Sequence, residues 1–382
     1  MNEVASRIRA HPLFRASIAA PIAIMLIFSL FNLTAAPDQE RVPGSVTLAI
    51  VNLDEGLPDQ PPLSEQLLAG LTGSIPASVR GFDDETTAVD ALDDGDVSAV
   101  LVVPGGFSAA VMGEEPVRLR FVASQHLSRS EVQFTAGLAR QIEGAISSAV
   151  AGIRLAAATG AFPPPEGAAL PGPAAIVETD ILHAANNAAA MSAPFVMTFA
   201  TWLAAMVGAL MIFLATRGEK DPAGLRPVGL LRSAIPLAVP ALASLALAIV
   251  VAWTTDNWGD VFVLWLFVWL ATSAIMLLMS GLFAVVGFFA LLLAIPAVFY
   301  QSALSGTQAP IGATPDWLEA IADVMPFEAL GTGYRSLVIG GGDGSLPVLL
   351  LLATGVVGLA LIWLGTWAHM RLVATRGGAA RA

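Results

Sequence analysis

The chain has 382 residues, 56% of them hydrophobic and only 13% charged, with a formal net charge of −12 at pH 7. Ordinary globular domains carry about 25% charged residues, so this composition predicts a membrane protein, and its acidic balance argues against nucleic-acid binding. The chain has no cysteine, which excludes disulfides and thiolate metal sites, and its 4 histidines are too widely spaced to suggest a metal-binding pair.

Apolar segments long enough to cross a bilayer recur along the chain. A membrane-spanning helix needs about 20 apolar residues, and six segments approach this length without any Asp, Glu, Lys or Arg. They are Ala16–Ala36, Pro194–Thr216, Ala234–Trp253, Val261–Met279, Leu282–Ala303 and Pro347–Met370. The first is interpreted as an uncleaved anchor; the alternative is a cleaved signal peptide, because arginines precede it and it ends in LTAA. The uncharged stretch Met279–Gly281 is predicted to be a short turn between the fourth and fifth segments.

The basic residues predict one orientation in the membrane. Arginine and lysine concentrate in cytoplasmic loops, and six crossings place three basic groups on one side, which is therefore predicted to be the cytoplasm and to hold both termini. The groups are Arg7, Arg9 and Arg15; Arg217, Lys220, Arg226 and Arg232; and Arg371, Arg376 and Arg381. The preference for arginine over lysine, with abundant Ala and Gly, suggests a GC-rich bacterial genome.

The polar block between the first two predicted spans, residues 37–193, is predicted to be an extracytoplasmic α/β domain. "SVTLAIVNLDEG" and "VSAVLVVPGGF" have the composition of buried strands, and "VRLRFVAS" alternates with the period of a strand. "DDETTAVDALDDGD" has helical spacing, and Ser128–Ala158 is predicted to be one long helix with an apolar stripe. A proline-rich linker follows, and Ile176–Met191 is predicted to be a second helix. The acidic clusters are interpreted as a solvated face rather than a cation site.

The segment Ser302–Gly342 is too polar to cross a bilayer and too apolar for a solvated loop. Thr314 suits a helix cap, Pro315 the first helical position and Asp316 the positive end of the helix dipole. The Met325–Pro326 step then separates two short amphipathic helices. Irregular backbone at membrane depth must be covered by protein or line a water-filled cavity. Residues 304–346 are therefore predicted to form a re-entrant hairpin that lines a pathway; the alternative is a pair of helices on the membrane surface.

The sequence holds no recognisable catalytic or nucleotide-binding motif. There is no phosphate-binding GxxxxGK[ST], no GxSxG and no HExxH, so we expect neither enzyme activity nor a cofactor in this chain. Ion-coupled carriers keep ionisable residues inside the membrane, whereas the six apolar segments lack Asp, Glu, Lys and Arg. The energy for any transport is therefore predicted to come from another subunit.

Two stretches resemble a known family. "SG…P…P.WL..I…MPF…..G.R", between the last two predicted spans, resembles the signature of type-2 ABC-transporter permeases. "LAIVNLDEG" followed by "ALDDGDVSAVLVVPGGFSAAV" resembles the YhgE/Pip branch, whose members carry an extracellular domain between spans one and two. The order of these pieces extends the resemblance over essentially the whole chain, although the external domain is much shorter than in the long phage-infection proteins.

The resemblance implies a homodimer and a separate ATP-hydrolysing subunit, which docks on the cytoplasmic loop "TRGEKDPAGLRPVGLLR" between spans two and three. The alternative is that the basic residues of this loop serve only membrane topology. The candidate coupling residues are Arg217, Glu219, Lys220, Asp221 and Arg226. The resemblance also implies a re-entrant hairpin between the last two spans, with the candidate residues Ser305, Gly306, Pro310, Pro315, Trp317, Pro326, Glu328 and Arg335.

The predicted organisation is a first span in residues 1–36, the α/β domain in 37–193, a five-span permease core in 194–370 and a cytoplasmic tail in 371–382. The expected function is export of an amphiphilic substrate, such as a lipid, glycolipid, peptide or drug, because the predicted pathway walls are uncharged. The alternative is a non-transporting surface protein that serves as a phage or toxin receptor or as an envelope-assembly factor. An ATPase gene beside this one would favour the permease.

Overall fold

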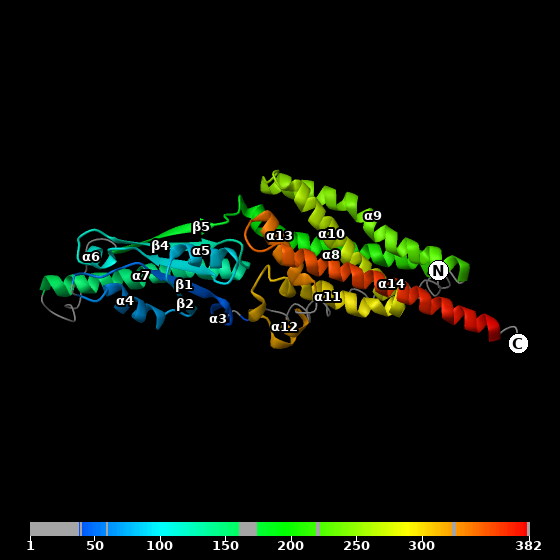
Figure 1. The fold of residues 1–382 in the computed structure, drawn as a ribbon, viewed down its shortest axis with the longest axis horizontal. Coiled ribbons are helices and arrows are strands. Elements are labelled where there is room, and N and C mark those ends of the chain that lie inside the picture. The colour runs from blue at the N-terminus through cyan, green and yellow to red at the C-terminus, as the bar shows by residue number, and fades with distance from the viewer. Residues whose placement is uncertain are drawn as a thin grey trace, which may run out of the picture.

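The computed structural model describes residues 38, 40–58, 60–159, 174–218, 222–322 and 326–379. An α/β domain and a bundle of long helices lie end to end along the longest axis (Figure 1). The predicted first span, Ala16–Ala36, and the predicted proline-rich linker lie outside the described residues.

The α/β domain is built on one sheet with the strand order β2-β1-β3-β4-β5. The strands are β1 Thr47–Asn52, β2 Ser78–Phe82, β3 Ala99–Val103, β4 Val117–Ser124 and β5 Ala175–Leu182. β1 runs parallel to β2 and β3, β4 antiparallel to β3, and β5 parallel to β4. β3 is buried along its whole length because helices cover both faces of this central strand, which explains its continuous apolar run. The three predicted strands are confirmed as β1, β3 and β4.

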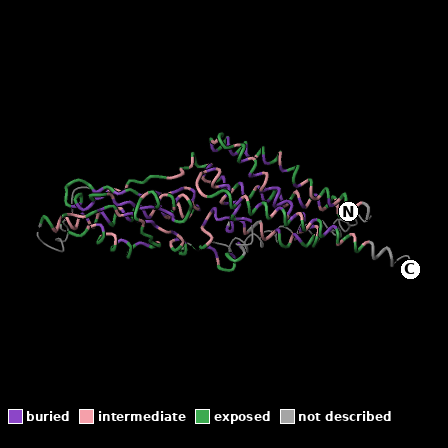
Figure 2. Tube along the Cα trace, viewed as in Figure 1, coloured by how far each residue is buried: buried purple, intermediate pink, exposed green. Residues whose placement is uncertain are grey.

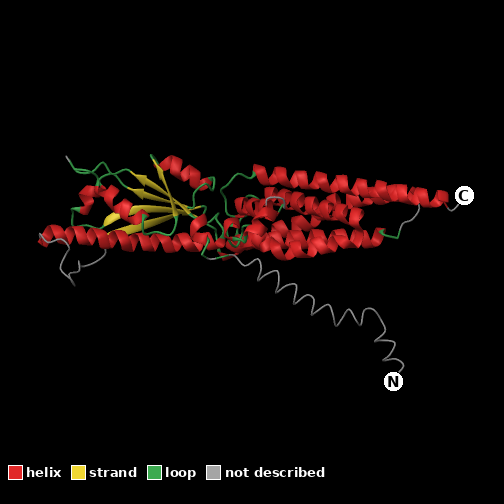
Figure 3. Cartoon of the chain, turned by 90° about the horizontal axis from the view of Figure 1, so that it is seen from below, coloured by secondary structure: helices red, strands yellow, loops and turns green. Residues whose placement is uncertain are grey.

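Helices cover both faces of the sheet. They are α3 Val42–Ser45, α4 Leu63–Thr72, α5 Glu85–Asp93, α6 Phe107–Val111 and α7 Arg129–Thr159. α4, α6 and α7 share one apolar cluster with the sheet, and α5 contributes to a second cluster on the other face. α5 and α7 confirm the two helices predicted within this part of the sequence. α7 runs along the domain, and its N-terminal end lies beside the helical bundle (Figure 3).

The helix predicted at Ile176–Met191 is wrong in its first half, which forms strand β5. β5 pairs with β4 over eight residues, from Val117↔Ala175 to Ser124↔Leu182, and so covers the edge of the sheet. Two ion pairs, Arg118–Glu178 and Arg120–Asp180, join the same strands. The long-range partner β4 decides the structure of this segment, whereas its local spacing suits a helix.

The second part of the described chain is helical. Its elements are α8 Ala188–Thr216, α9 Pro222–Thr255, α10 Val261–Val286, η1 Gly287–Ala290, α11 Leu291–Leu304, η2 Ile311–Ala313, α12 Asp316–Ala322, α13 Phe327–Val338 and α14 Ser345–Ala379. Within the described ranges, 4 helical stretches are long and apolar enough to cross a membrane: Ala188–Thr216, Gly224–Thr255, Val261–Ala297 and Ser345–Val373. The count of six spans therefore stays a prediction.

The turn predicted at Met279–Gly281 is wrong, because α10 continues through it to Val286. Gly281 serves a helix crossing instead: a Cβ atom there would lie 2.6 Å from the carbonyl oxygen of Gly358 on α14. α10 is followed by Gly287, whose φ of +63° is positive and favours glycine. The predicted fifth span is consequently divided between the end of α10, η1 and the 14-residue α11.

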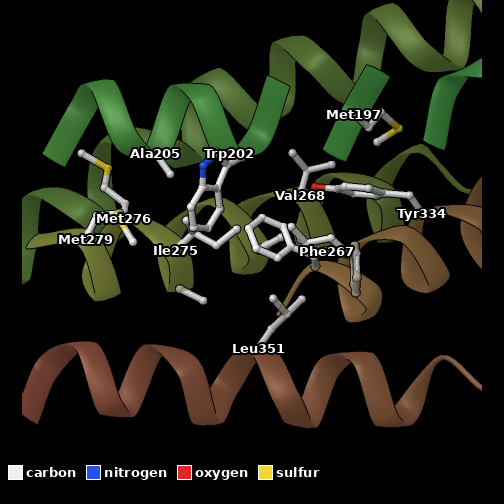
Figure 4. Packing of buried hydrophobic residues seen from close by; sticks show 14 of the residues in the cluster. Met197, Trp202, Ala205, Phe267, Val268, Ile275, Met276, Met279, Tyr334 and Leu351 are labelled. Carbon is white, nitrogen blue, oxygen red and sulfur yellow. The ribbon is translucent and has the colours of Figure 1, made fainter. Parts of the chain in front are cut away.

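The interior of the bundle is a continuous apolar cluster contributed mainly by α8, α10 and α13. Figure 4 shows Met197, Trp202, Phe267 and Tyr334 pointing into the space between the helices. Trp202 packs on Phe327 with ring centroids 4.7 Å apart, and the Tyr334 hydroxyl lies 2.6 Å from Thr201 Oγ1. The outer faces of the long helices are exposed (Figure 2) and rich in large apolar residues, as lipid-facing helices require.

Candidate functional site

The α/β domain is fixed to the bundle at the N-terminus of α7. The first amide groups of a helix have no partner within the helix. In α7 these groups are satisfied by the loop after α11: Arg129 N donates to Thr307 O at 3.2 Å and Ser130 N to Gln308 O at 3.0 Å. The same terminus carries a capping box, in which Ser128 N donates to Glu131 Oε2 at 3.0 Å. The loop after α11 is therefore joined directly to the first turn of α7.

A second contact is made by the glycine loop Gly340–Gly342, which connects α13 to α14. Gly342 N donates to Asp93 O at 3.0 Å, and Asp93 Oδ1 lies 2.5 Å from His183 Nε2. The loop glycines have φ values of +103°, +75° and +71°, and a Cβ atom at any of them would come within 2.8 Å of His126 or His183. Only glycine fits, because both the backbone conformation and the closeness of the two imidazole rings exclude a side chain.

A third contact lies at the start of the described chain. Asp38 N donates to Ala313 O at 2.8 Å, and Arg41 Nη1 bonds to Asp316 Oδ1 at 2.6 Å. These groups tie the segment before β1 to η2 and α12. The α/β domain is thus held at the loop 305–310, at the loop 340–342 and at the start of α12.

A cavity of about 500 Å³ lies between these contacts. One wall comes from the α/β domain and includes Asp94, His126 and Glu131. The opposite wall comes from the loop after α11, from α13, from the loop between α13 and α14, and from the first turns of α14. Its polar residues include Glu328, Arg335 and Asp343, and its apolar residues include Ile311, Leu346, Pro347 and Leu350. The cavity therefore combines a charged part with an apolar part.

Arg335 joins the two limbs of the predicted hairpin beside this cavity. Its Nη1 donates to Gly306 O, and its Nη2 donates to Thr332 Oγ1 at 3.3 Å. The Nε atom is buried and has no hydrogen-bond partner in the part of the chain that the structure describes. The guanidinium thus fixes α13 to the loop that caps α7.

The sequence profile of a family described as "ABC-2 family transporter protein" matches residues 13–221. The match covers more than half of the chain. The chain belongs to this ABC-2 transporter family. Members of the family are membrane components that are not themselves catalytic, and the family implies a partner ATP-binding subunit. With four helices able to cross a membrane among its described residues, this ABC-2 protein is a multi-pass membrane protein.

One solved structure is similar to part of the ABC-2 chain. It is a domain of a protein from Thermotoga maritima MSB8 described as an ABC type-2 transporter, with 22% sequence identity and a TM-score of 0.25. The similarity covers 35% of this chain and 86% of that domain. No match was found among curated proteins.

Four of the eight candidate hairpin residues line the cavity of the ABC-2 chain: Gly306, Pro310, Glu328 and Arg335. The other four lie outside its lining. Ser305 is buried and its hydroxyl contacts that of Thr307 at 2.8 Å, and Trp317 packs edge-on against Tyr300. Pro315 accepts the first amide bonds of α12, and Pro326 is the buried N-cap of α13.

Sequence reasoning missed the contribution of the α/β domain to this cavity. His126 and Glu131 are far from the hairpin in the chain, and no local pattern relates them to it. The Ser128-x-x-Glu131 capping box was the available signal, because it marks a helix start with amide groups that need partners. That signal locates the N-terminus of α7 but does not identify the loop that caps it.

The end of α8 and the start of α9, which carry the candidate coupling residues Arg217 and Arg226, lie at the end of the bundle remote from the α/β domain (Figure 1). The loop predicted up to Arg232 is wrong in extent, since α9 begins at Pro222, a residue suited to the first helical turn. Arg226 is therefore an exposed helical residue, and Arg217 is the C-cap of α8. Arg217 and Arg232 border a cavity of about 310 Å³ between the helix ends. Glu219, Lys220 and Asp221 lie outside the described residues.

We expect acid to weaken the attachment of the α/β domain through His126. Burial, with a smaller contribution from the positive charge of Arg335, lowers the pKa of His126 to about 4. In the unfolded chain the His126 imidazole has a pKa of about 6.5, so the unfolded state binds the proton first as pH falls. The stability that the neutral imidazole gives to the folded state is therefore complete above about pH 6.5 and is lost toward pH 4. Over this pH range the free energy of unfolding is expected to fall by about 3 kcal/mol.

Thermal unfolding of the purified protein at pH 7.5 and pH 5.0 measures this effect. Besides burial, the groups that act on the ring are Arg335, the Gly340 backbone, His183 and Asp93. His126→Gln should remove most of the acid sensitivity, whereas His369→Gln, at the other end of the bundle, should retain it. Equal acid sensitivity in both variants would contradict the assignment to His126.

Arg335→Ala is expected to loosen the loop that caps α7. The substitution leaves the Gly306 carbonyl without its charged donor, and hydrogen bonds to charged groups contribute about 1.5–3 kcal/mol. Hydrogen exchange of the Arg129 and Ser130 amides should accelerate accordingly. Arg335→Lys should give an intermediate rate, because one ammonium group cannot replace the planar guanidinium. Arg140→Ala, an exposed change on α7, is the matched control; if it accelerates exchange as much as Arg335→Ala, the proposed role of Arg335 is wrong.

Proposed function

We propose that this ABC-2 protein is the permease subunit of a bacterial ABC-type exporter that moves an amphiphilic substrate and is driven by a separate ATPase. The observation that carries this proposal is the cavity of about 500 Å³ between the α/β domain and the helical bundle, here called the junction cavity. One part of it has carboxylate, guanidinium and imidazole groups, and another part has Ile311, Leu346 and Leu350. Such a cavity suits a molecule with a polar headgroup and an apolar chain. The uncharged faces of the long helices suit the same class of substrate.

The proposed topology has six spans, with both termini in the cytoplasm and the α/β domain outside the cell. The basic residues Arg217, Arg226 and Arg232 support this orientation, because they belong to the end of α8 and the first turns of α9, and these helix ends lie opposite the α/β domain. The YhgE/Pip-like order of motifs supports the insertion of this domain after the first span. We further propose that the functional unit is a homodimer in the bacterial cytoplasmic membrane.

The proposed re-entrant hairpin comprises residues 304–346, with α12 and α13 as its two short helices. The burial of α13 supports this interpretation over helices that lie flat on the membrane. Phe327, Leu330 and Tyr334 of α13 are fully buried in the bundle. A helix that lay on the membrane surface would instead keep one face in the headgroup region. Trp317 on α12 is 47% exposed, which is consistent with a position at the rim of the hairpin.

Co-purification from native membranes, followed by mass spectrometry, tests the proposed partnership. We expect an ATP-binding subunit to be recovered with the full-length chain, and we expect deletion of either gene to cause accumulation of the same amphiphile in the cell. Recovery of no ATPase, together with unchanged export, would contradict the permease and favour a surface receptor or an envelope-assembly factor.

A further inference from the structure

The cavity of about 310 Å³ between the ends of α8 and α10, the first turns of α9 and the C-terminal half of α14, here called the helix-end cavity, has a basic lining. Arg217, Arg232 and His369 line it, and no Asp or Glu does so among the described residues. Residues 217–232 as a whole carry four basic and two acidic side chains, so the sequence keeps a basic surplus in this region. An anionic group is therefore the favoured occupant.

The guanidinium of Arg232 is held in position at this cavity. Its Nε donates to Thr216 Oγ1 at 3.0 Å, and its Cζ lies 5.8 Å from the centre of the Phe213 ring. Thr216 Oγ1 in turn donates to Ile212 O at 2.7 Å, which fixes the acceptor. None of the ion pairs between described residues includes Arg232. Its two Nη groups therefore have no carboxylate partner in that part of the chain, and such a pair of donors matches the oxygens of a phosphate.

Two observations place Arg232 at the depth of the lipid headgroups. Arg232 comes two residues before the uncharged apolar segment Ala234–Trp253, which is long enough to cross the hydrocarbon core. On the neighbouring α14, Trp363 and Trp367 are 39% and 47% exposed, and tryptophan is enriched where a membrane meets water. Gly229 of α9 lies at this level, because a Cβ atom there would be 3.4 Å from the Trp363 ring. The phosphate groups of the adjacent leaflet are therefore within reach of the cavity.

The apolar part of the lining favours a lipid over a soluble anion. Phe213 and Phe283 stack with ring centroids 5.1 Å apart, and both line the cavity together with Leu225 and Val228. Val285 also lines the cavity and is 46% exposed on α10, one of the helices able to cross a membrane. An acyl chain would cover this apolar surface and pass Val285 toward the surrounding lipid, whereas a free phosphate would leave it uncovered.

We propose that the helix-end cavity binds the phosphate of an anionic phospholipid from the leaflet remote from the α/β domain. The Arg232 guanidinium donates to the phosphate through its two Nη groups, Arg217 adds a second positive charge, and an acyl chain lies along Val285. A basic pocket between membrane helices is a recognised form of anionic-lipid site. The bound lipid joins the ends of four helices, and its binding is a property of this chain that requires neither an ATPase nor transport.

Native mass spectrometry of the purified full-length protein tests the proposal. The protein is exchanged into detergent with equal amounts of phosphatidylglycerol and phosphatidylcholine, which share their acyl chains and a phosphate and differ in net charge. We expect phosphatidylglycerol to be retained roughly tenfold more than phosphatidylcholine, and Arg232→Gln to remove most of this preference. Arg232→Lys should keep only part of it, because an ammonium keeps the charge but lacks the paired Nη donors. Excess inorganic phosphate should not displace the lipid, since it cannot cover the apolar lining.

Arg371→Gln is the matched control and should retain phosphatidylglycerol like the parent protein. It removes the same charge near the same membrane surface, but its guanidinium stacks on Trp367 at 4.0 Å and does not line the cavity. An equal loss in Arg371→Gln and Arg232→Gln would indicate unspecific attraction to a basic surface and overturn the proposal.

Three other results would also overturn the proposed lipid site. Displacement of the lipid by inorganic phosphate would show a site for soluble anions. Loss of a co-purified ATPase in Arg232→Gln, without any lipid preference in the parent protein, would assign the cavity to an acidic group of that subunit. Should Arg232→Gln fail to fold, Arg232→Lys decides, because the full parental preference in that variant would contradict the paired contact. Lipid selectivity in a chain that recovers no ATPase would preserve this site and count against the exporter.

Discussion

Replacing Gly358 by alanine is expected to prevent α10 and α14 from packing and so to disrupt the membrane part of the protein. A Cβ atom at this position would lie 2.4 Å from the Leu277 carbonyl carbon and the Leu278 nitrogen. Both are backbone atoms of α10, which cannot move aside as a flexible side chain can. Overpacking of a well-packed interior typically costs 1–3 kcal/mol, and a clash with a helix backbone should cost about 3 kcal/mol or more.

The crossing of α10 and α14 has close backbone contacts on both helices, and these add to the destabilisation expected for Gly358→Ala. Gly281 of α10 faces Gly358, and Gly365, two turns further along α14, would place a Cβ atom 2.5 Å from Ala284 O. In a membrane the helices associate through close van der Waals packing, because lipid is as apolar as the side chains. Separating the two backbones therefore removes the main attraction between them.

Gly355→Ala is the matched control on the same helix. Its Cβ atom would lie 3.6 Å from Ala274 Cα, an ordinary contact distance. Thermal stability and size-exclusion profiles of both variants in detergent measure the outcome. We expect Gly355→Ala to behave like the parent protein and Gly358→Ala to be recovered in low yield or as aggregate. Similar behaviour of the two variants would show that the α10–α14 crossing is not tightly packed.

Reversing the charges of Arg217 and Lys220 to Glu is expected to abolish both ATPase co-purification and export. Arg217 is exposed at the end of α8, where its amide donates to Phe213 O and thereby fixes the backbone. One exposed ion pair contributes only about 0–1 kcal/mol, so a single alanine should have little effect. Two reversed charges facing an acidic partner surface instead produce repulsion, which costs several kcal/mol.

The charge-preserving exchange of Arg217→Lys with Lys220→Arg controls for changes in side-chain shape. It should retain the partner and export, and the reversed protein should keep its helical content and elution volume. Compensating reversals on the ATPase should restore both functions to the Glu variant. Normal export by that variant would mean that these residues do not couple the two subunits, and it would favour the surface-protein alternative.

Much of the architecture follows from the sequence itself, because it depends on local patterns. Long uncharged apolar segments indicate the membrane helices α8, α9 and α14, since only a helix satisfies its backbone groups in lipid. Strands β1, β3 and β4 follow from β-branched runs or alternation, and α7 follows from its apolar stripe. The spacing of prolines around α12 and α13 likewise indicates two short helices, and the motif order indicates the transporter family.

Other features depend on partners that are distant in the chain. Ile176–Leu182 is a strand because β4 needs an edge partner, and Met279–Gly281 remains helical because Gly358 packs against it. The cavity exists because the amide groups of α7 find their acceptors at Thr307 and Gln308, which brings Glu131 and His126 to face Glu328 and Arg335. Periodicity identifies the face that a segment buries, whereas long-range contacts decide which partner covers that face. In this protein those contacts place charged groups of the α/β domain and of the helical bundle around the same cavity.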